Sequence, residues 1–157
     1  MALETTAATR HLARHGVEFS THRYPYQERG GAKHAAACLG VPEHVVVKTL
    51  VLRTDSGENL LVLMHGDRQV SSKQLARELG VRRVAACSPE QALRVTGYVV
   101  GGISPFGTLT ELPVCVESSI FELPRVYING GRRGLLVALE PAALKQALAV
   151  REVAVAR

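Results

Sequence analysis

The side chain with the clearest chemical potential is Lys48, an ammonium inside the apolar run VVVKTLVL at residues 45–52. Side chains of a strand alternate between two faces, so Lys48 shares a face with Val46 and Leu50. An ammonium on an apolar face is costly unless it reaches water or a partner. A lysine on an edge strand would extend to solvent, whereas the apolar residues on both sides favour a central strand. The pattern therefore predicts that Lys48 projects into a pocket and meets an anion or a carbonyl oxygen there.

Two glycine-rich loops are the other candidates for chemistry, and each follows an apolar segment that we predict to be a strand. A glycine pair on its own is typical of a turn. Glycines also let backbone N–H groups approach a ligand, and adjacent amides can bind an anion or a carbonyl oxygen. Two such loops, one of them followed by two arginines, indicate a substrate cradle. The loops are TGYVVGGISPFG (96–107), with Gly101, Gly102, Ser104 and Pro105, and YINGGRRGL (127–135), with Gly130, Gly131, Arg132 and Arg133.

Other residues capable of catalysis or metal binding form no strong motif. The chain has no Walker loop, HExxH, GxSxG or paired-cysteine motif. His11 and His15 lie four residues apart, as do His34 and Cys38, but no third ligand is near either pair, so a solvated helix face is the better interpretation. The three widely spaced cysteines argue against a disulfide framework and a thiolate zinc site. We therefore expect neither a metal nor another cofactor.

Composition indicates an ordinary globular protein with a basic surface. The 157 residues, 46% of them hydrophobic, favour a single domain over 1–157 with a true core. The net charge of +5 and the pI near 9.4 fit a polyanionic partner, while 4% aromatic content weighs against a stacking platform for single strands. No apolar run is long enough to span a membrane, and the N-terminus lacks the apolar segment of a signal peptide. A cytoplasmic location without a membrane partner is the default expectation.

Capping residues and periodicity predict five helices and about seven short strands without regular βαβ alternation. The expected fold is therefore α+β, one domain built on a curved or barrel-like mixed sheet. The helices are expected near residues 5–15, 32–40, 71–80, 88–97 and 141–149, and the strands within 17–24, 45–52, 60–65, 81–87, 98–102, 112–118, 125–131 and 134–140, with 152–156 as a candidate terminal strand.

The ordered set VVVKTLVL, TGYVVGGISPFG and YINGGRRGL resembles the YbaK/ProX family of free-standing aminoacyl-tRNA deacylases, which is related to the editing domain of bacterial prolyl-tRNA synthetases. The match runs from the FSTHRY segment to the final helix. The resemblance implies a compact mixed-sheet barrel flanked by helices that acts in trans on mischarged tRNA. It implies hydrolysis of the ester that joins a wrong amino acid, typically Cys or Ala, to proline tRNA. A prolyl-tRNA synthetase as a further partner, and the oligomeric state, are left open.

The resemblance also assigns roles to residues by motif. Lys48 matches the family's functional lysine, and the loop from Gly101 to Pro105 matches its G-x-x-x-P loop. The predicted catalytic residues are Lys48, Gly101, Gly102 and Ser104, and the predicted substrate-binding residues are Tyr24, Thr49, Pro105, Asn129, Gly130, Gly131, Arg132 and Arg133.

Two positions differ from the Cys-specific branch of the family that this chain resembles. That branch has Ser where this chain has Asn129, and an acidic residue where this chain has Leu136. Asn is bulkier than Ser and offers both a donor and an acceptor, so Asn129 is predicted to narrow or re-polarise the pocket. Leu136 either lines the pocket or points into the core. These departures favour Ala as a substrate at least as strongly as Cys.

Two other functions fit the same residues. An aminoacyl ester is already activated, so the absence of a Ser-His-Asp set is compatible with deacylation through proximity and backbone amides. The same absence is compatible with a non-catalytic tRNA-binding or regulatory module. The glycine loops would also suit a hydrolase of small acylated or phosphorylated metabolites. Turnover of a mischarged tRNA, and the salt dependence of binding, separate the three.

Overall fold

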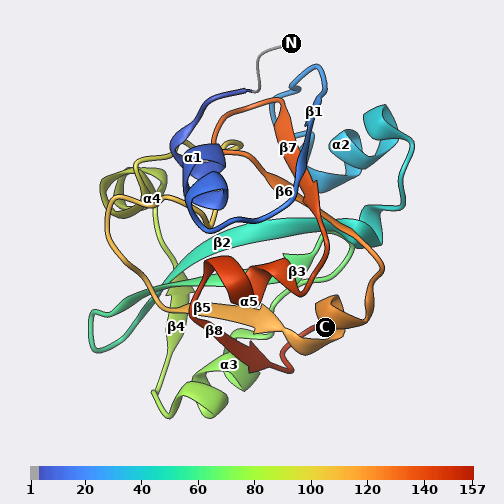
Figure 1. Ribbon diagram of the computed structural model, residues 1–157. Coiled ribbons are helices and arrows are strands. Elements are labelled where there is room, and N and C mark those ends of the chain that lie inside the picture. Colours follow the sequence, from blue (N-terminus) through green and yellow to red (C-terminus); the bar gives the residue numbers. More distant parts are fainter. Residues whose placement is uncertain (1–3) are drawn as a thin grey trace.

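The computed structural model describes residues 4–157, and one mixed sheet of eight strands forms its centre (Figure 1). The strand order is β1-β7-β6-β2-β3-β5-β8, and β4 also pairs with β2. The pairs β2–β6, β3–β5 and β5–β8 are parallel, and the remaining pairs are antiparallel. The predicted α+β fold with a mixed sheet is confirmed. The strands are β1 (Ser20–Arg23), β2 (Val46–Thr54), β3 (Asn59–His65), β4 (Val84–Ala86), β5 (Val114–Glu117), β6 (Val126–Asn129), β7 (Leu135–Leu139) and β8 (Val150–Val153).

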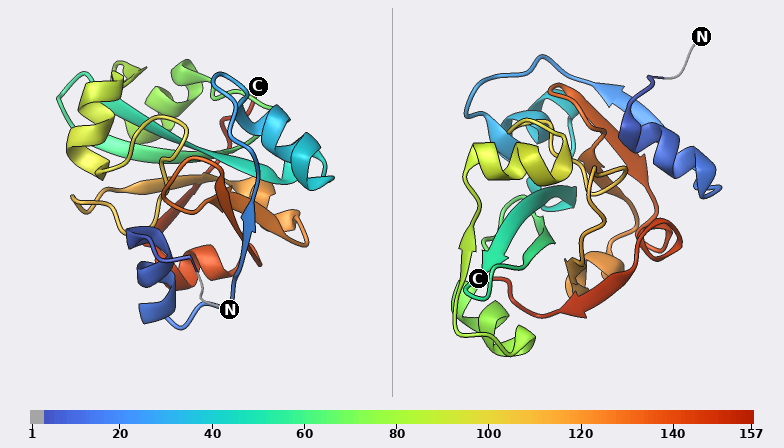
Figure 2. Two further views of the ribbon diagram at one scale, coloured as in Figure 1. Left: turned by 90° about the horizontal axis from the view of Figure 1, so that it is seen from above. Right: turned by 90° about the vertical axis from the view of Figure 1, so that its left-hand side faces the viewer.

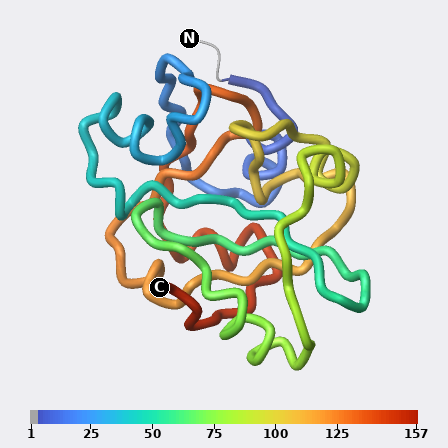
Figure 3. The backbone as a smooth tube through the Cα atoms, turned by 180° about the vertical axis from the view of Figure 1, so that it is seen from behind, coloured from blue at the N-terminus to red at the C-terminus, as the bar shows by residue number. Residues whose placement is uncertain are grey.

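Five α-helices flank the sheet, as predicted, and side-chain caps and glycines define most of their ends. Thr6 and Ser88 form complete capping boxes, and Ser71 accepts a hydrogen bond from the backbone N of Gln74. Seen from behind, α2 and α4 lie on either side of β2, whereas α1 and α5 lie at the front of the molecule (Figures 1 and 3). The helices are α1 (Ala7–Arg14), α2 (Gly31–Leu39), α3 (Ser72–Leu79), α4 (Pro89–Thr96) and α5 (Ala143–Ala147), with short 3-10 helices at Glu43–Val45 and Ser118–Glu122.

Strand β2 is central, and its two faces enter different parts of the core. Val47 and Val51 belong to the main core, which also holds residues of α1, α5 and β7. On the other face, Val46 belongs to a small cluster with residues of α2, and Leu52 to a second cluster with residues of α3. Lys48 lies on this second face between the two clusters, on a central strand as the sequence predicts.

The segment 98–102, which we predict from sequence to be a strand, is a loop. Helix α4 ends at Gly97 in the left-handed conformation, and Gly102 N donates to Val99 O at 2.8 Å, which closes a turn. The buried Tyr98 donates from its hydroxyl to Phe106 O at 2.5 Å. The hydrogen bond lies within the turn, and no strand of residues 4–157 pairs with this segment. Figure 2 shows the loop lying between α4 and α1.

Several boundaries also differ from the sequence-based expectation. The first strand covers only Ser20–Arg23, and the last helix begins at Ala143, after a turn that starts at Pro141. The terminal strand lies at Val150–Val153 rather than 152–156, because β8 aligns with β5 in parallel register. The following residues continue past the sheet, and Ala156 pairs with Val70 as an isolated bridge.

Tyr98 is expected to stabilise this loop measurably. Burial raises the pKa of Tyr98 to about 12, compared with about 10 in an unfolded chain. The neutral hydroxyl therefore contributes its full stabilisation below about pH 10, and loses up to roughly 3 kcal/mol as the pH rises towards 12. Tyr98→Phe leaves the Phe106 carbonyl without its partner and should cost about 1–3 kcal/mol in the free energy of unfolding.

Urea unfolding of both proteins near pH 8 and near pH 11 tests this expectation. The difference in free energy of unfolding between wild type and Tyr98→Phe should be largest near pH 8 and smaller near pH 11. A Phe variant as stable as wild type near pH 8 would show that the Tyr98 hydroxyl contributes nothing to the loop.

Candidate active site

A pocket of about 630 Å³ opens beside residues 46–52 of β2, between α2 and α4. Its wall is mostly apolar, with a few polar groups that converge on the strand, which is the usual composition of a small-ligand site. The pocket brings together five of the predicted site residues, Tyr24, Lys48, Thr49, Gly101 and Asn129, and Leu136 lines it as well.

The pocket lies where β2 changes its neighbour in the sheet. Val46 and Val47 pair with β6, whereas residues 52–54 pair with β4. Within residues 4–157, no strand pairs with residues 48–51 on this side. Cys87 N donates to Val51 O across the far end of the opening. Alternate residues of a strand direct their backbone groups to the same side, so the N–H and C=O of Thr49 also face the opening.

Lys48 lines this pocket, and its ammonium already has a partner in the protein. Nζ donates to the backbone carbonyl of Arg68 at 2.5 Å. Partial burial lowers the pKa of Lys48, and the carboxylates of Glu43 and Asp67 oppose this effect. The lysine charge is thus partly desolvated, and among the described residues Nζ makes one hydrogen bond with its three N–H groups. An anionic or carbonyl group of a ligand would add a favourable partner.

The loop that offers the Arg68 carbonyl is held by the C-terminal end of the chain. Gln69 and Arg157 exchange two backbone hydrogen bonds of 3.0 and 2.8 Å, and Ser71 N donates to Val155 O at 2.8 Å. The buried Glu117 carboxylate accepts from Val155 N at 2.7 Å. Sequence reasoning missed these contacts, because the residues are far apart in the chain and belong to no motif.

A second set of polar residues lies next to the segment that carries Arg68, whose backbone N donates to His65 O at 3.1 Å. The rings of His44 and His65 stack with centroids 3.8 Å apart, and His44 Nδ1 lies 2.8 Å from Asp67 Oδ1. The buried His65 bonds to His44 O through Nδ1 and to Ser119 Oγ through Nε2. Burial lowers the pKa of His65. No sequence motif marks this group.

Thr49 carries an unsatisfied polar atom at the pocket. Its Oγ1 is buried and has no hydrogen-bond partner among the described residues. Buried hydroxyl groups are nearly always paired, and an unpaired one is costly. The Thr49 hydroxyl is thus an unpaired polar group beside the pocket, and the backbone N–H and C=O of Thr49 that face the opening offer the pocket a donor and an acceptor.

The two glycine loops, which the sequence predicts to form one cradle, pack directly against each other. Asn129 joins them, because its Nδ2 donates to Gly101 O at 2.9 Å and its Oδ1 accepts from Gly131 N at 2.7 Å. Gly102 faces the backbone of the second loop so closely that an added Cβ would lie 2.9–3.0 Å from atoms of Arg132 and Arg133. The Asn129 amide is therefore largely engaged within the protein while its residue lines the pocket.

Leu136 lies next to Asn129 across the β6–β7 pair and is buried. It packs in the cluster with Val46 and the alanines of α2, and it also lines the pocket. The two alternatives for this residue therefore both apply, since it is part of a small core and part of the pocket wall. It gives that wall an apolar surface.

The structure does not place every predicted site residue at the pocket. Ser104 is fully buried and its Oγ accepts from Phe106 N at 3.3 Å. Pro105 lines a second cavity beside α1. Gly130 donates to Leu135 O, and Gly131 is close to Tyr98. Gly102 supports the cradle by its contact with the second loop. The roles assigned to these residues stay predictions.

The two arginines after the second glycine pair have different surroundings. Arg132 forms an ion pair with Glu4 at 2.5 Å, on the side of the N-terminal segment. Arg133 donates from Nε to Val100 O at 2.9 Å, and its guanidinium lies 5.0 Å from the ring centroid of Tyr26. Tyr26 lines the pocket, and sequence reasoning missed it, although it follows Tyr24 by two residues. Arg133 is therefore the arginine of this pair that lies at the pocket mouth.

The fold and pocket define an α+β domain with a cavity of small-ligand size beside a lysine and two glycine loops that pack against each other. Residues 28–147 match the model of the aminoacyl-tRNA editing domain. The chain belongs to this family, whose members act on mischarged tRNA and are related to prolyl-tRNA synthetase.

Individual relatives agree with this assignment. The chain is 25% identical over 142 residues to an Enterococcus faecalis protein named "Putative Cys-tRNA(Pro)/Cys-tRNA(Cys) deacylase EbsC", covering 90% of this chain and 87% of that one. It is 37% identical over 75 residues to a proline–tRNA ligase of Nitratidesulfovibrio vulgaris, covering 48% of this chain and 13% of the ligase. A solved structure titled "Crystal structure of a putative trans-editing enzyme for prolyl tRNA synthetase" has the same fold, with a TM-score of 0.86 and 24% identity over 98% of this chain and 99% of that chain.

Residues 4–157 contain neither a cluster of metal-binding side chains nor a membrane-spanning helix. No three His, Cys, Asp or Glu side chains come together in a way that would hold a metal ion. No helix in this part of the chain is both long and apolar enough to cross a membrane.

Proposed function

We propose that this protein is a trans-acting deacylase that hydrolyses the ester of a mischarged tRNA, most simply proline tRNA carrying Ala or Cys. The observation that carries the proposal is Lys48, a partly desolvated ammonium on a central strand in a pocket flanked by glycine-loop backbone. Membership of the editing-domain family supports the substrate class. We further propose that the chain acts as a single domain in the cytoplasm, where charged tRNA is used.

In the proposed reaction, the pocket holds the aminoacyl group and the 3′-terminal ribose. Lys48 turns from the Arg68 carbonyl to an oxygen of the terminal nucleotide's phosphate or of the ester. Backbone N–H groups beside Gly101 stabilise the negative charge that develops on the ester carbonyl oxygen. Water, or the thiol of a bound cysteine, attacks the carbonyl carbon, the bond to the ribose oxygen breaks, and that oxygen takes up a proton. Positioning supplies most of the rate enhancement, because the ester is already activated.

The pocket wall supports Ala as a substrate at least as readily as Cys. Leu136 offers an apolar surface, and the Asn129 amide is bonded to both glycine loops. Neither side chain supplies a free charged group to orient a thiol or an α-ammonium. A hydrophobic pocket discriminates between substrates that differ by one small group by only about 1–3 kcal/mol, so small residues are expected to share it.

The test is a panel of Cys-, Ala-, Ser- and Thr-charged tRNAs, including proline tRNA charged with Ala and with Cys under identical conditions. The expected kcat/KM for Ala equals or exceeds that for Cys. A preference for Cys of about a hundredfold, which corresponds to about 2.7 kcal/mol, would contradict the Ala assignment.

The same panel separates the two alternative functions. A non-catalytic binding module would protect the ester and slow its spontaneous hydrolysis. A hydrolase of small metabolites would show little dependence of KM on salt, whereas binding that neutralises tRNA phosphates weakens steeply as salt rises.

A further inference from the structure

A second concave surface lies outside the pocket and is rich in basic side chains. This groove of about 800 Å³ runs between α1, α5 and the segment 105–112. One face of α1 contributes Arg10, His11, Arg14 and His15 to it. We call this surface the α1 groove.

The two arginines of the α1 groove are exposed and available. Within residues 4–157, neither the Arg10 nor the Arg14 side chain makes a hydrogen bond or an ion pair. Arg132, in contrast, is paired with Glu4, and Lys145 with Glu152. The arginines lie four residues apart, so they project from successive turns of one helix face. A row of unpaired guanidinium groups along a groove matches a ligand with repeated anionic oxygens.

The two histidines lie on the same surface. Their rings stack with centroids 4.3 Å apart. His11 Nε2 lies 2.8 Å from Ala147 O, and His15 Nδ1 lies 2.8 Å from His11 O, so each of these nitrogens carries a hydrogen that it donates to a carbonyl. His11 Nδ1 and His15 Nε2 have no partner among the described residues. Each of these two nitrogens is open to a hydrogen-bond partner on a bound ligand.

The α1 groove and the pocket lie on either side of one loop. Gly101 and Ile103 line the pocket, and Pro105 and Gly107 line the groove. In Figure 2 this loop passes between α4, beside the pocket, and α1. A chain-like ligand anchored in the pocket by one end can pass over the loop and reach α1.

We propose that the α1 groove binds backbone phosphates of the RNA whose acylated 3′ end occupies the pocket. The proposal rests on the proposed function for the identity of the ligand. The groove supplies charge rather than base recognition, so it strengthens binding to any tRNA and leaves the choice of amino acid to the pocket. Glu111, which is exposed at the same groove, opposes this binding.

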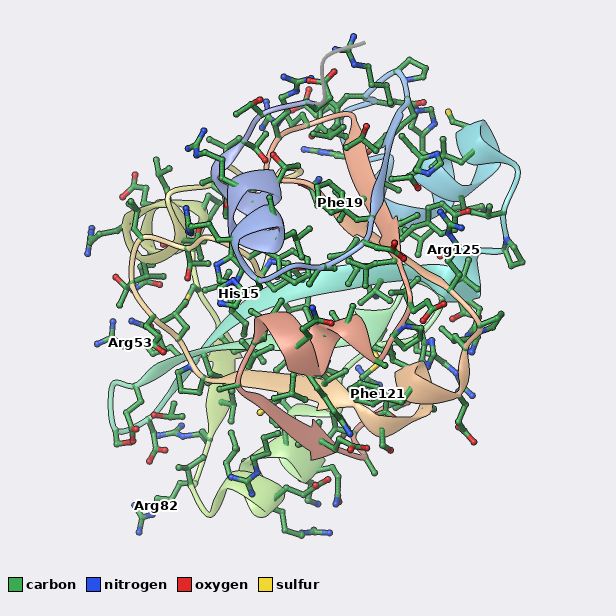
Figure 4. All side chains as sticks on the ribbon, viewed as in Figure 1. His15, Phe19, Arg53, Arg82, Phe121 and Arg125 are labelled. Carbon is green, nitrogen blue, oxygen red and sulfur yellow. The ribbon has the colours of Figure 1, made fainter. Side chains whose placement is uncertain are left out.

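The test is the affinity for uncharged tRNA, measured by fluorescence anisotropy over a range of salt concentrations. The variant is Arg10→Ala/Arg14→Ala, and the matched control is Arg82→Ala/Arg83→Ala. Both lower the formal net charge by two, from +5 to +3. Arg82 lies at the lower end of the molecule, well away from His15 of the α1 groove (Figure 4). Alanine is a good helix former, so α1 is expected to remain folded.

Loss of two phosphate contacts should weaken binding and reduce the magnitude of the slope of log K against log salt by about two. The control should change the slope much less, and Glu111→Gln should tighten binding. Equal effects of the two double variants would overturn the proposal, because they would show that only net charge matters. An unchanged slope in the α1 variant would overturn it as well.

A second measurement separates this proposal from the proposed function. Hydrolysis of a short acylated CCA oligonucleotide, which reaches the pocket but not the α1 groove, should be the same in wild type and the α1 variant. If wild type binds tRNA through α1 but hydrolyses no acylated RNA, the groove stands and the deacylase function fails. If deacylation occurs and the α1 variant retains full tRNA affinity, the function stands and the groove fails.

Discussion

Lys48→Ala is expected to lower kcat/KM for deacylation by about a hundredfold or more, the loss typical of removing a group that stabilises developing charge. Its melting temperature should stay within a few degrees of wild type. Burial lowers the pKa of Lys48, so the charged side chain gives up hydration in the fold. Its removal leaves the Arg68 carbonyl, on an exposed residue, free to bond to water.

Two further variants make this test specific. Lys48→Met keeps most of the aliphatic chain and removes the charge, so it should lose activity to the same extent as Lys48→Ala. Lys73→Ala removes an exposed lysine from α3 and should keep wild-type activity. A fully active Lys48→Met variant would contradict the assignment of Lys48 to the site, whatever its melting temperature.

Gly102→Ala is expected to have the second largest effect, and it acts through the cradle. A Cβ on Gly102 would lie 2.9–3.0 Å from backbone atoms of Arg132 and Arg133, which cannot move aside as a flexible side chain would. The two loops must therefore separate, and the Asn129 bond to Gly101 O should weaken or break. We expect kcat/KM to fall by at least about tenfold, since misplacement by about an ångström at a site is costly, and the melting temperature to fall by several degrees.

Gly80→Ala provides the matched control for the loss of stability. Gly80 has a φ of +72° and no atom within 4 Å of an added Cβ, so alanine there introduces backbone strain without a clash. The control should lose about 1 kcal/mol of stability and no activity. If Gly102→Ala were as active as Gly80→Ala at equal melting temperature, the contact between the two loops would not be needed for the reaction.

Local signals account for the elements that sequence reasoning placed correctly. The helices that begin after Thr6, Ser71 and Ser88 are marked by capping side chains, which act within one turn of the chain. The central position of Lys48 can be predicted because an ammonium is conspicuous within an apolar strand. The prediction of a strand at 98–102 is wrong. Its valines have strand propensity, but the segment closes a turn through Gly102 N and Val99 O, and the Tyr98 hydroxyl bonds to Phe106 O, so no described strand pairs with it.

Contacts between distant parts of the chain account for what the sequence could not predict. The opening beside residues 48–51 exists because β6 pairs with β2 only at Val46 and Val47, and β4 pairs with it only at residues 52–54. The position of the Arg68 carbonyl depends on Arg157, almost ninety positions later, and on the buried Glu117. Ser104 reads as a polar loop residue in the sequence, yet the loop folds so that it is buried. Contacts between residues so far apart in the chain leave no pattern in the sequence near either residue.

The most direct test of the central claim is single-turnover hydrolysis of Ala-charged proline tRNA by the wild-type protein in excess, followed as release of labelled alanine. Pro-charged proline tRNA and Lys48→Ala serve as parallel controls. We predict rapid release from the Ala-charged tRNA, slow release from the Pro-charged tRNA, and release near the uncatalysed rate with Lys48→Ala. Release of alanine at or below the uncatalysed rate with wild type would contradict the account, and would favour a module that binds tRNA without cleaving the ester.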